Sequence, residues 1–276
     1  MDFKVLDAGD FYKLEQVGPY VYHRPSPAAV WPRGNHPLYD KVDAKYERYQ
    51  NGKGEWFYNN KSMKDKFVID VLNLKIEMQH SSFGHLGLFA EQLINWKRLQ
   101  KNVEAGDKVL NLFAYTGVAS LVCASKGAEL AHVDASKTSV TWARRNQELS
   151  GLEDKKVRWL IDDVQKFVAK EVRRESKYDW IILDPPSFGR GNNREVWQIE
   201  DHLHGLMRNL SKLKSNNFKG ILLSSHSPGY SPKALENILK TTGFKEEMGF
   251  CHEMLIEHDE CPLPSGACAW QTNIEL

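Results

Sequence analysis

The feature that most constrains the fold is a regular alternation of short apolar runs and helical patterns that begins at Lys108. Each apolar run is about five residues long, and a segment with apolar residues at helical spacing follows it. Repeated β-α-β units of this kind form a mostly parallel sheet with helices on both faces and right-handed crossovers. The sequence therefore predicts an α/β domain. Its expected strands are Lys108–Leu112, Leu130–Asp134, Val157–Ile161, Trp180–Asp184 and Gly220–Ser225, and its expected helices are Val118–Lys126, Ser136–Leu149, Val164–Arg174, Val196–Leu213 and Pro232–Thr241.

Residues 1–80 have a different pattern, which predicts a small β-rich N-terminal region. Five prolines between residues 19 and 37 interrupt any regular element there. Short β-like pieces occur at 19–22 and 54–58, and the alternating segments Phe67–Val71 and Leu74–Met78 predict a hairpin. Residues 81–276 then form the main domain. Three segments near its end suit antiparallel additions to the sheet edge: Phe244–Phe250, Met254–Glu257 and Ala267–Thr272.

Composition and charge exclude several classes of protein. The four cysteines are too few and too scattered for a disulfide scaffold, and no apolar run approaches the eighteen residues of a membrane span. No secretion signal is visible, so we expect a reduced, cytoplasmic protein. The net charge of +1 gives no global attraction to nucleic acid, but residues 41–66 and 155–177 are locally basic and are candidates for RNA contact. The cysteines and histidines near the end are irregularly spaced without C-x-x-C, so no metal site is expected.

Polar residues stand at four successive strand ends, where a parallel sheet binds its ligands. Asn111–Gly117 leads from the first strand into a helix without the G-x-G-x-x-G pattern of dinucleotide sites. Asp134 ends the second strand, where a carboxylate can accept from the ribose hydroxyls of an adenosine. After the third strand come Asp162 and Asp163, of which one can cap the next helix and the other can accept from an adenine amino group. The fourth strand ends in Asp184-Pro-Pro-Ser-Phe188, where two prolines stiffen the loop. Each could be structural alone, but together they predict one ligand site.

These motifs, with the upstream segment 83–96, resemble class I S-adenosylmethionine-dependent methyltransferases. More narrowly, they are similar to the bacterial branch that modifies 23S ribosomal RNA at cytosine C5 or guanine N7. The resemblance covers about residues 66–230 and implies a Rossmann-like sheet with S-adenosyl-L-methionine as the cofactor. It also implies that the 111–117 loop faces the methionine part, Asp134 the ribose and Asp163 the adenine. The implied cofactor-binding residues are Phe89, Gln92, Asn111, Phe113, Tyr115, Thr116, Gly117, Asp134, Ala135, Ser136, Asp162, Asp163 and Asp184.

Two departures from the branch bear on the chemistry. Leu86 stands where the branch usually has threonine, and its cytosine-C5 members carry a nucleophilic cysteine after the fifth strand. This chain reads Ser224-Ser-His-Ser there, and no thiol is present to add to C6 of cytosine. Methylation of a nitrogen needs no such adduct, only an exposed lone pair held in line. The candidate catalytic residues are Asp184, Pro185 and His226, the last of which could equally be a structural histidine, and the candidate substrate-binding residues are Phe188, Arg190 and Arg194.

We therefore expect a methyltransferase that acts on a base nitrogen of ribosomal RNA by direct transfer. Two alternatives stay open: a methyltransferase acting on a protein or small molecule, and a catalytically silent RNA-binding relative. A dinucleotide oxidoreductase is disfavoured because the glycine triplet is missing.

Overall fold

The computed structural model describes residues 2–49, 53–190, 195–258 and 260–276. The chain divides into two compact units. The first contains Met1–Leu93 and Leu255–Ser265, and the second contains Ile94–Met254 and Gly266–Leu276. The first unit thus extends past residue 80 and takes in a segment from near the end of the chain. None of the helices in the described residues has the length and apolar character needed to cross a membrane.

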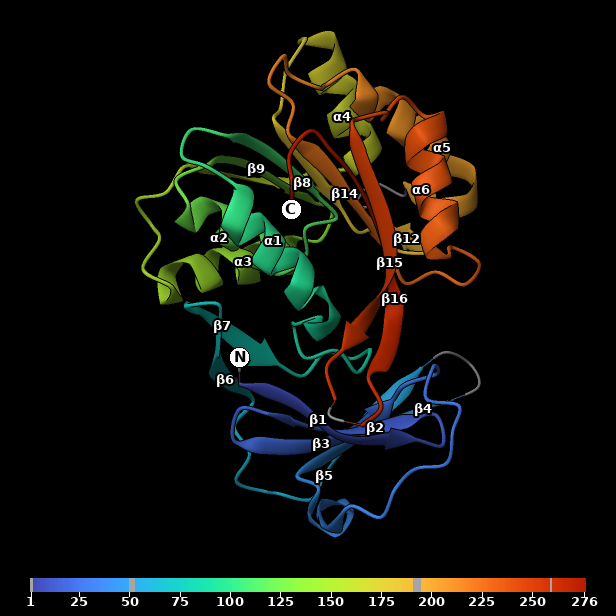
Figure 1. Cartoon of the computed structure of the whole chain (residues 1–276). Helices are drawn as coiled ribbons and strands as arrows, with labels where there is room; N and C mark the ends of the chain where they lie inside the picture. Colours follow the sequence, from blue (N-terminus) through green and yellow to red (C-terminus); the bar gives the residue numbers. More distant parts are fainter. Residues whose placement is uncertain (1, 50–52, 191–194, 259) are drawn as a thin grey trace. The chain divides into compact units, whose positions relative to one another are not determined.

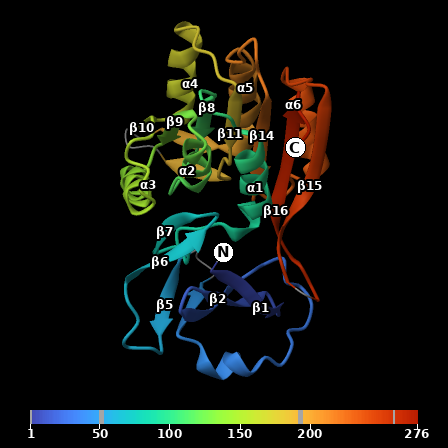
Figure 2. The same cartoon turned by 60° about the vertical axis from the view of Figure 1, so that its left-hand side comes forward.

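The second unit is built on a seven-stranded sheet in the order β10-β9-β8-β11-β14-β16-β15 (Figures 1 and 2). Neighbours among the first five strands pair in parallel, and β16 pairs antiparallel with β14, so the predicted α/β sheet with an antiparallel edge is confirmed. The strands are β8 (Lys108–Leu112), β9 (Glu129–Asp134), β10 (Val157–Ile161), β11 (Trp180–Leu183), β14 (Gly220–Ser225), β15 (Met248–Ile256) and β16 (Leu263–Thr272). Three strands were predicted at the end of the domain, but the structure has two. The predicted segments 244–250 and 254–257 both overlap the single strand β15, and the third lies within β16.

The helices of the unit are α1 (Leu93–Asn102), α2 (Val118–Ser125), α3 (Lys137–Leu149), α4 (Val164–Arg173), α5 (Ile199–Ser211) and α6 (Pro232–Thr241). Side chains of Ser136, Asp163 and Ser231 cap three of them, which explains where they begin. The helix predicted from Val196 begins three residues later. Val196–Gln198 instead form β13, which pairs antiparallel with β12 (Phe188–Arg190).

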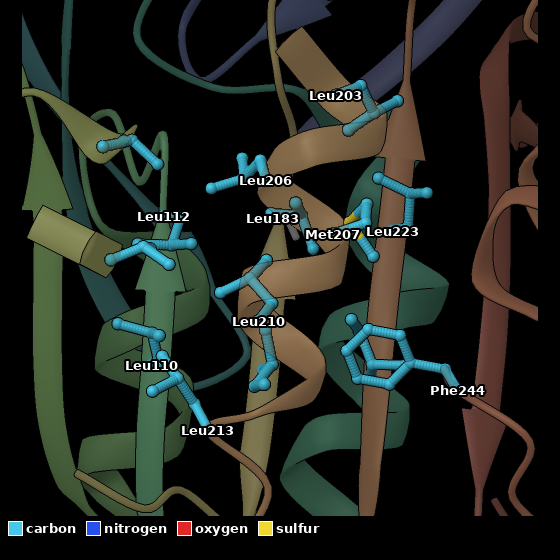
Figure 3. Packing of buried hydrophobic residues seen from close by; sticks show 14 of the residues in the cluster. Leu110, Leu112, Leu183, Leu203, Leu206, Met207, Leu210, Leu213, Leu223 and Phe244 are labelled. Atoms are coloured by element: carbon cyan, nitrogen blue, oxygen red, sulfur yellow. The ribbon is translucent and has the colours of Figure 1, made fainter. Parts of the chain in front are cut away.

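The core lies between one face of the sheet and helices α4, α5 and α6. Leucines of α5 point toward alternate residues of the parallel strands, among them Leu110, Leu183 and Leu223 (Figure 3). Because strand residues alternate between faces, Asn111 and His132 belong to the other face, where α2 and α3 contact the strands. This packing fixes the strand ends that carry the polar motifs.

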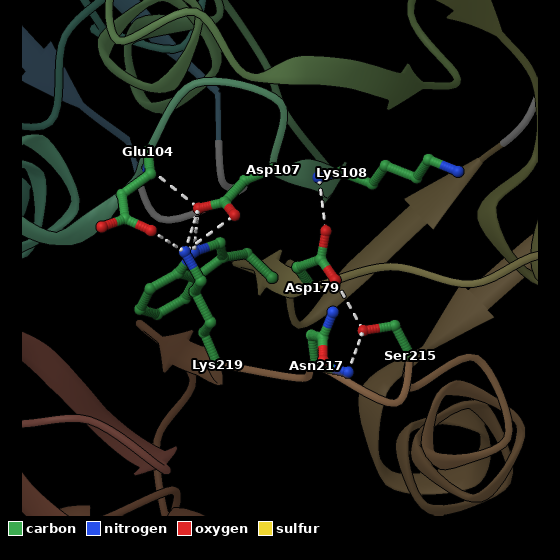
Figure 4. Close-up of polar contacts among 8 residues, drawn as sticks. Glu104, Asp107, Lys108, Asp179, Ser215, Asn217 and Lys219 are labelled. Carbon is green, nitrogen blue, oxygen red and sulfur yellow. Dashed lines mark hydrogen bonds and ion pairs between the residues drawn. The ribbon is translucent and has the colours of Figure 1, made fainter.

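Polar contacts hold the opposite, amino-terminal ends of the central strands (Figure 4). Lys219, directly before β14, is ion-paired with Asp107 at 2.8 Å and with Glu104 at 2.5 Å. Asp107 also accepts from the buried indole N–H of Trp180 at 3.1 Å. Beside it, Asp179 accepts from the backbone N–H of Lys108 at 2.8 Å. These bonds tie β8, β11 and β14 together at that edge.

The first unit contains a five-stranded sheet in the order β1-β2-β3-β4-β5 and a separate hairpin of β6 and β7. The β-rich prediction is confirmed, but β1, β2 and β4 were not predicted. A buried ion pair between Glu15 and Arg24 and an apolar cluster that includes Val5, Ile256 and Leu263 hold the unit together. Its elements are β1 (Phe3–Gly9), β2 (Tyr12–Val17), β3 (Tyr20–Pro25), η1 (Pro37–Lys41), β4 (Ala44–Arg48), β5 (Gly54–Tyr58), β6 (Lys66–Val71), β7 (Leu74–Gln79) and η2 (Ala90–Gln92).

Candidate active site

The candidate site lies at the carboxyl ends of the parallel strands. The order of the sheet reverses between β8 and β11, since β9 and β10 lie on one side and β14 on the other. A crevice at such a switch point is where open α/β sheets bind ligands. The loops after β8, β9, β10, β11 and β14 all leave the sheet at this edge.

The loop after β8 is held in an unusual backbone conformation. Phe113 and Tyr115 have φ values of 53° and 48°, which residues other than glycine seldom adopt. Gly117 has φ 85° and begins α2, and a Cβ there would lie 2.9 Å from Cβ of Ala143 in α3. Glycine is therefore required for α2 and α3 to pack closely. The loop enters α2 without a capping side chain, so backbone N–H groups stand at the helix start.

Below this loop, Asn111 takes part in a buried polar chain. Its side-chain N–H donates to Oγ of Ser120 at 2.9 Å, and Oγ of Ser120 lies 3.0 Å from Nδ1 of His132. All three residues are buried. Sequence reasoning missed Ser120 and His132, although a polar residue in an apolar helix and another in an apolar strand are the signal that could have found them. These buried polar contacts hold in place the end of β8 from which the loop begins.

Asp134 joins the β8 loop to the β9 loop. Its Oδ2 accepts from the backbone N–H of Tyr115 at 2.9 Å, and its Oδ1 accepts from that of Ser136 at 2.8 Å. Burial raises the pKa of the Asp134 carboxyl, and the N–H groups of Ser136 and Tyr115 act in the opposite direction. Each carboxylate oxygen has a second lone pair, so both can still accept from a pair of ribose hydroxyls. This acceptor at a strand end, beside a loop of backbone donors, fits an adenosine cofactor.

The two aspartates after β10 have different partners. Oδ1 of Asp163 accepts from the backbone N–H of Lys166 at 2.9 Å and so caps α4. Asp162 is ion-paired with Lys170 at 2.7 Å. The expectation that one of them caps the helix is confirmed, with Asp163 in that role. The assignment of Asp163 to the adenine stays a prediction, for which its second oxygen would serve.

The ends of β11 and β14 are linked by polar contacts. Oδ1 of Asp184 lies 3.4 Å from Nδ1 of His226, and the hydroxyl oxygens of Ser187 and Ser227 are 2.7 Å apart. The structure thus brings together two of the three predicted catalytic residues, while Pro185 is buried directly after Asp184. His226 is partly exposed. A histidine close to a carboxylate in this way can orient or accept a proton.

Trp197 holds the proline loop in place. Its indole N–H donates to the carbonyl of Pro186 at 2.7 Å, and its ring centroid lies 4.8 Å from that of Phe113. It thereby connects the β11 loop to the β8 loop. Sequence reasoning placed Trp197 inside a helix, whereas β13 presents it to both loops.

Phe188 and Arg190 lie on β12, beside the proline loop. Phe188 is 52% exposed, which is unusual for a large aromatic side chain, and the Arg190 guanidinium lies 5.7 Å from its ring centroid. Arg194 lies outside the described residues. Phe89 and Gln92 belong to the first unit, where Phe89 precedes η2 and Gln92 is buried at its end.

No cysteine stands on the β11 loop or the segment after β14, both of which are described. Cys123 in α2 and Cys268 in β16 are buried, and burial raises the pKa of Cys268 to about 12. Burial also raises the pKa of Cys251 in β15. Thiols with raised pKa values are poor nucleophiles because little thiolate is present.

A comparison with protein families matches residues 27–240 to the S-adenosylmethionine-dependent methyltransferase family. The chain belongs to this family. A solved SAM-dependent methyltransferase from Agrobacterium tumefaciens is 34% identical with a TM-score of 0.94, covering 99% of this chain and 91% of that one. The structure of SMU.776 complexed with SAH shares the fold, with 20% identity, a TM-score of 0.76, and coverage of 98% and 75%.

Curated relatives are similar over part of their length. The ribosomal RNA large subunit methyltransferase K/L of Pseudomonas aeruginosa is 31% identical over 191 residues, which are 65% of this chain and 25% of that protein. The ribosomal RNA large subunit methyltransferase K of Neisseria meningitidis is 32% identical over 138 residues, 50% of this chain and 38% of that protein. The chain therefore spans about a quarter to two fifths of these relatives. The family to which it belongs consists of S-adenosylmethionine-dependent methyltransferases.

Proposed function

We propose that this methyltransferase acts on a base nitrogen of ribosomal RNA by direct in-line transfer. The names of the curated relatives support RNA as the substrate class. The loops that border the site carry no thiol in their described residues, which favours a nitrogen over cytosine C5.

The observation that carries the proposal is the exposed Phe188 ring, which follows the Asp184 of the Asp184–His226 pair by four residues. A base in folded RNA must leave its stack before it can react, and it needs a new aromatic partner. Phe188 offers that face, and Arg190 beside it suits a neighbouring phosphate.

The residues then have distinct tasks in the reaction. S-adenosyl-L-methionine supplies an electrophilic methyl group when it is bound. Asp134 would hold the ribose of the bound cofactor, and the loop that Trp197 fixes sets the position of Asp184 and Phe188. The acceptor nitrogen uses its lone pair to form the new bond to carbon as the sulfur–carbon bond breaks. His226, held by Asp184, orients the base or takes up a proton that it releases.

The test compares transfer of a tritiated methyl group to ribosomal particles and to protein extract, both from a strain lacking the gene. We expect label in the RNA of the particles. Label found only in protein would overturn the RNA substrate and leave the enzyme class standing. RNA binding with no label in any fraction would instead identify a catalytically silent relative.

A substitution at Phe188 tests how the base is held. Phe188→Ala should weaken RNA binding by about 1–3 kcal/mol because the stacking face is lost. Phe188→Trp is the matched control and should bind RNA like the wild type. Calorimetric titration should give the same affinity for S-adenosyl-L-methionine in all three proteins. If the alanine variant binds RNA as tightly as the wild type, Phe188 does not contact the base.

A further inference from the structure

A second concave site lies at the end of the sheet opposite the cofactor loops. It is a pocket of about 490 Å³ at the amino-terminal ends of β8, β9 and β10, and α4 and the segment before β11 complete it. Its volume is within the roughly 300–1,000 Å³ of small-ligand sites. The strands are five or six residues long, so about 15–20 Å separate this pocket from the cofactor edge.

Charged side chains dominate the lining of this pocket. Four are basic, and two, Glu129 and Glu171, are acidic. Glu129 is ion-paired with Lys156 at 2.7 Å. Glu171 is buried, accepts from the Tyr178 hydroxyl at 2.7 Å and is ion-paired with Arg174 at 3.0 Å. Both acidic charges are therefore compensated locally.

Three basic side chains of the lining form no ion pair with a described carboxylate. They are Lys108, Arg158 and Lys177. Among the residues that the structure describes, no carboxylate forms an ion pair with any of them. Nζ of Lys177 donates to the carbonyl of Lys212 at 2.9 Å, a contact that leaves its charge unbalanced. Arg158 interacts with the Tyr178 hydroxyl and attracts Glu171, and Lys108 attracts Glu129, in each case without forming an ion pair.

We infer that this pocket binds a phosphate group, at a site separate from the cofactor edge. Three cationic residues without an ion-paired carboxylate line this concave surface and lower the free energy of an anion there, and the guanidinium of Arg158 can pair with two phosphate oxygens at once. Apolar atoms of Leu130 and Val157 also line the pocket, which leaves room for a group attached to the phosphate.

The site accounts for a sequence pattern that the methyltransferase motifs leave unexplained. The segment 155–177 holds eight basic residues against four acidic ones, and it contributes Arg158 and Lys177 to the lining. The inference does not depend on which molecule is methylated. The phosphate belongs either to a free nucleotide or to the backbone of an RNA, and the experiment distinguishes these sources.

The experiment replaces Lys108, Arg158 and Lys177 together with glutamine. The matched control replaces Lys97, Lys101 and Lys126, three exposed lysines on or at the ends of α1 and α2, and removes the same net charge. Arg158→Gln alone is a milder variant if the triple variant is unstable. All proteins are saturated with S-adenosylhomocysteine, so the cofactor edge is blocked. Pyrophosphate and uridine monophosphate are titrated by calorimetry, and a fluorescent ribosomal RNA fragment is titrated at several salt concentrations.

Wild type and control should bind pyrophosphate and the nucleotide, and the pocket variant should not. If RNA supplies the phosphate, the variant should also bind the fragment more weakly. The slope of the logarithm of its RNA affinity against the logarithm of the salt concentration should be shallower by about 1 to 2. Loss of nucleotide binding with unchanged RNA binding identifies a free-nucleotide site. Equal binding by pocket variant and control in both titrations overturns the inference, whatever the outcome of the methylation assay.

Discussion

At the scale of single residues, Asp134 does two things at once. Its two oxygens accept from the Tyr115 and Ser136 backbone N–H groups, and we propose that the same oxygens accept from the ribose of the cofactor. The strained φ of Tyr115 depends on the first of these contacts, since a left-handed backbone costs roughly 1–2 kcal/mol per residue. Cofactor affinity and loop geometry are therefore coupled at this position.

Asp134→Ala should weaken S-adenosyl-L-methionine binding by roughly 1.5–3 kcal/mol, because charged acceptors for the ribose are lost. Asp134→Asn keeps one acceptor oxygen and should fall between alanine and wild type. Since burial raises the pKa of the Asp134 carboxyl, wild-type affinity should decline as pH falls through that raised value, and the asparagine variant should lack this decline. Calorimetry across pH measures both effects. Equal affinities for the three proteins would show that the cofactor does not bind at Asp134.

No cysteine should be needed for turnover. Serine at Cys123, Cys251, Cys261 or Cys268 should leave methyl transfer intact, with losses of stability only at the buried positions 123 and 268. Single-turnover assays on folded, cofactor-binding variants test this. Loss of chemistry in any one of them would contradict direct transfer.

The aspartates of the site could be identified from the sequence because each stands at the end of a clear apolar strand. Their interaction partners could not be identified in this way. The pairing of Asp184 with His226 depends on β11 and β14 being neighbours in the sheet, and the ion pair of Asp162 with Lys170 depends on the course of α4. Such contacts follow from tertiary packing rather than local pattern.

At the scale of elements, the antiparallel pair of β12 and β13 carries Phe188, Arg190 and Trp197. The three residues before α5 follow a helical pattern in sequence, yet they form a strand because β12 offers them backbone partners. The prediction failed there because tertiary pairing outweighed local propensity. The strands of the parallel sheet, by contrast, were predicted almost residue by residue, since each is a short, mainly apolar run. This holds even for β10 at the sheet edge, whose residues are not fully buried.

Trp197→Phe should loosen the proline loop. The ring can still pack against Phe113, but the exposed Pro186 carbonyl loses the hydrogen bond from the indole, at a cost of about 0.5–1.5 kcal/mol. We expect KM for the acceptor to rise while cofactor affinity stays unchanged. Steady-state kinetics with calorimetry tests this, and an unchanged KM would show that the hairpin does not control acceptor binding.

At the amino-terminal edge of the sheet, the contacts of Asp107, which does not line the proposed phosphate pocket, should be structural. Asp107→Ala removes the acceptor of the buried Trp180 N–H and one partner of Lys219, and should lower the free energy of unfolding by about 2–4 kcal/mol. Glu104→Ala is the matched control, because Glu104 is exposed and its ion pair with the same lysine should contribute under 1 kcal/mol, roughly. Chemical denaturation measures both, and similar losses would contradict this ranking.

At the scale of the whole molecule, the first unit is completed by residues from near the end of the chain. Ile256 and Leu263 are buried in its apolar cluster with Val5, Ala8 and Ala29. The sequence did not predict this, because the short strands β1, β2 and β4 lack long apolar runs and nothing local marks residues 255–265 as their partners. Long-range packing of this kind is invisible to pattern analysis.

Ile256→Ala and Leu263→Ala should each destabilise the first unit by about 2–5 kcal/mol through loss of buried apolar contacts. Hydrogen exchange should therefore accelerate in β1 and β2. Leu255→Ala is the control, since that side chain is 43% exposed and its loss should change stability by about 0.5 kcal/mol or less. Equal exchange in the three variants would show that the segment is not part of the unit's core.

The completion of the first unit by Leu255–Ser265 has a consequence during protein synthesis. The first unit lacks part of its core until roughly 160 further residues beyond Leu93 have been added. At the usual 5–20 residues per second, this takes on the order of ten to thirty seconds, during which Val5 and its neighbours are incompletely covered. The nascent chain is thus expected to need chaperone protection early, and to release it only when Leu255–Ser265 leaves the ribosome.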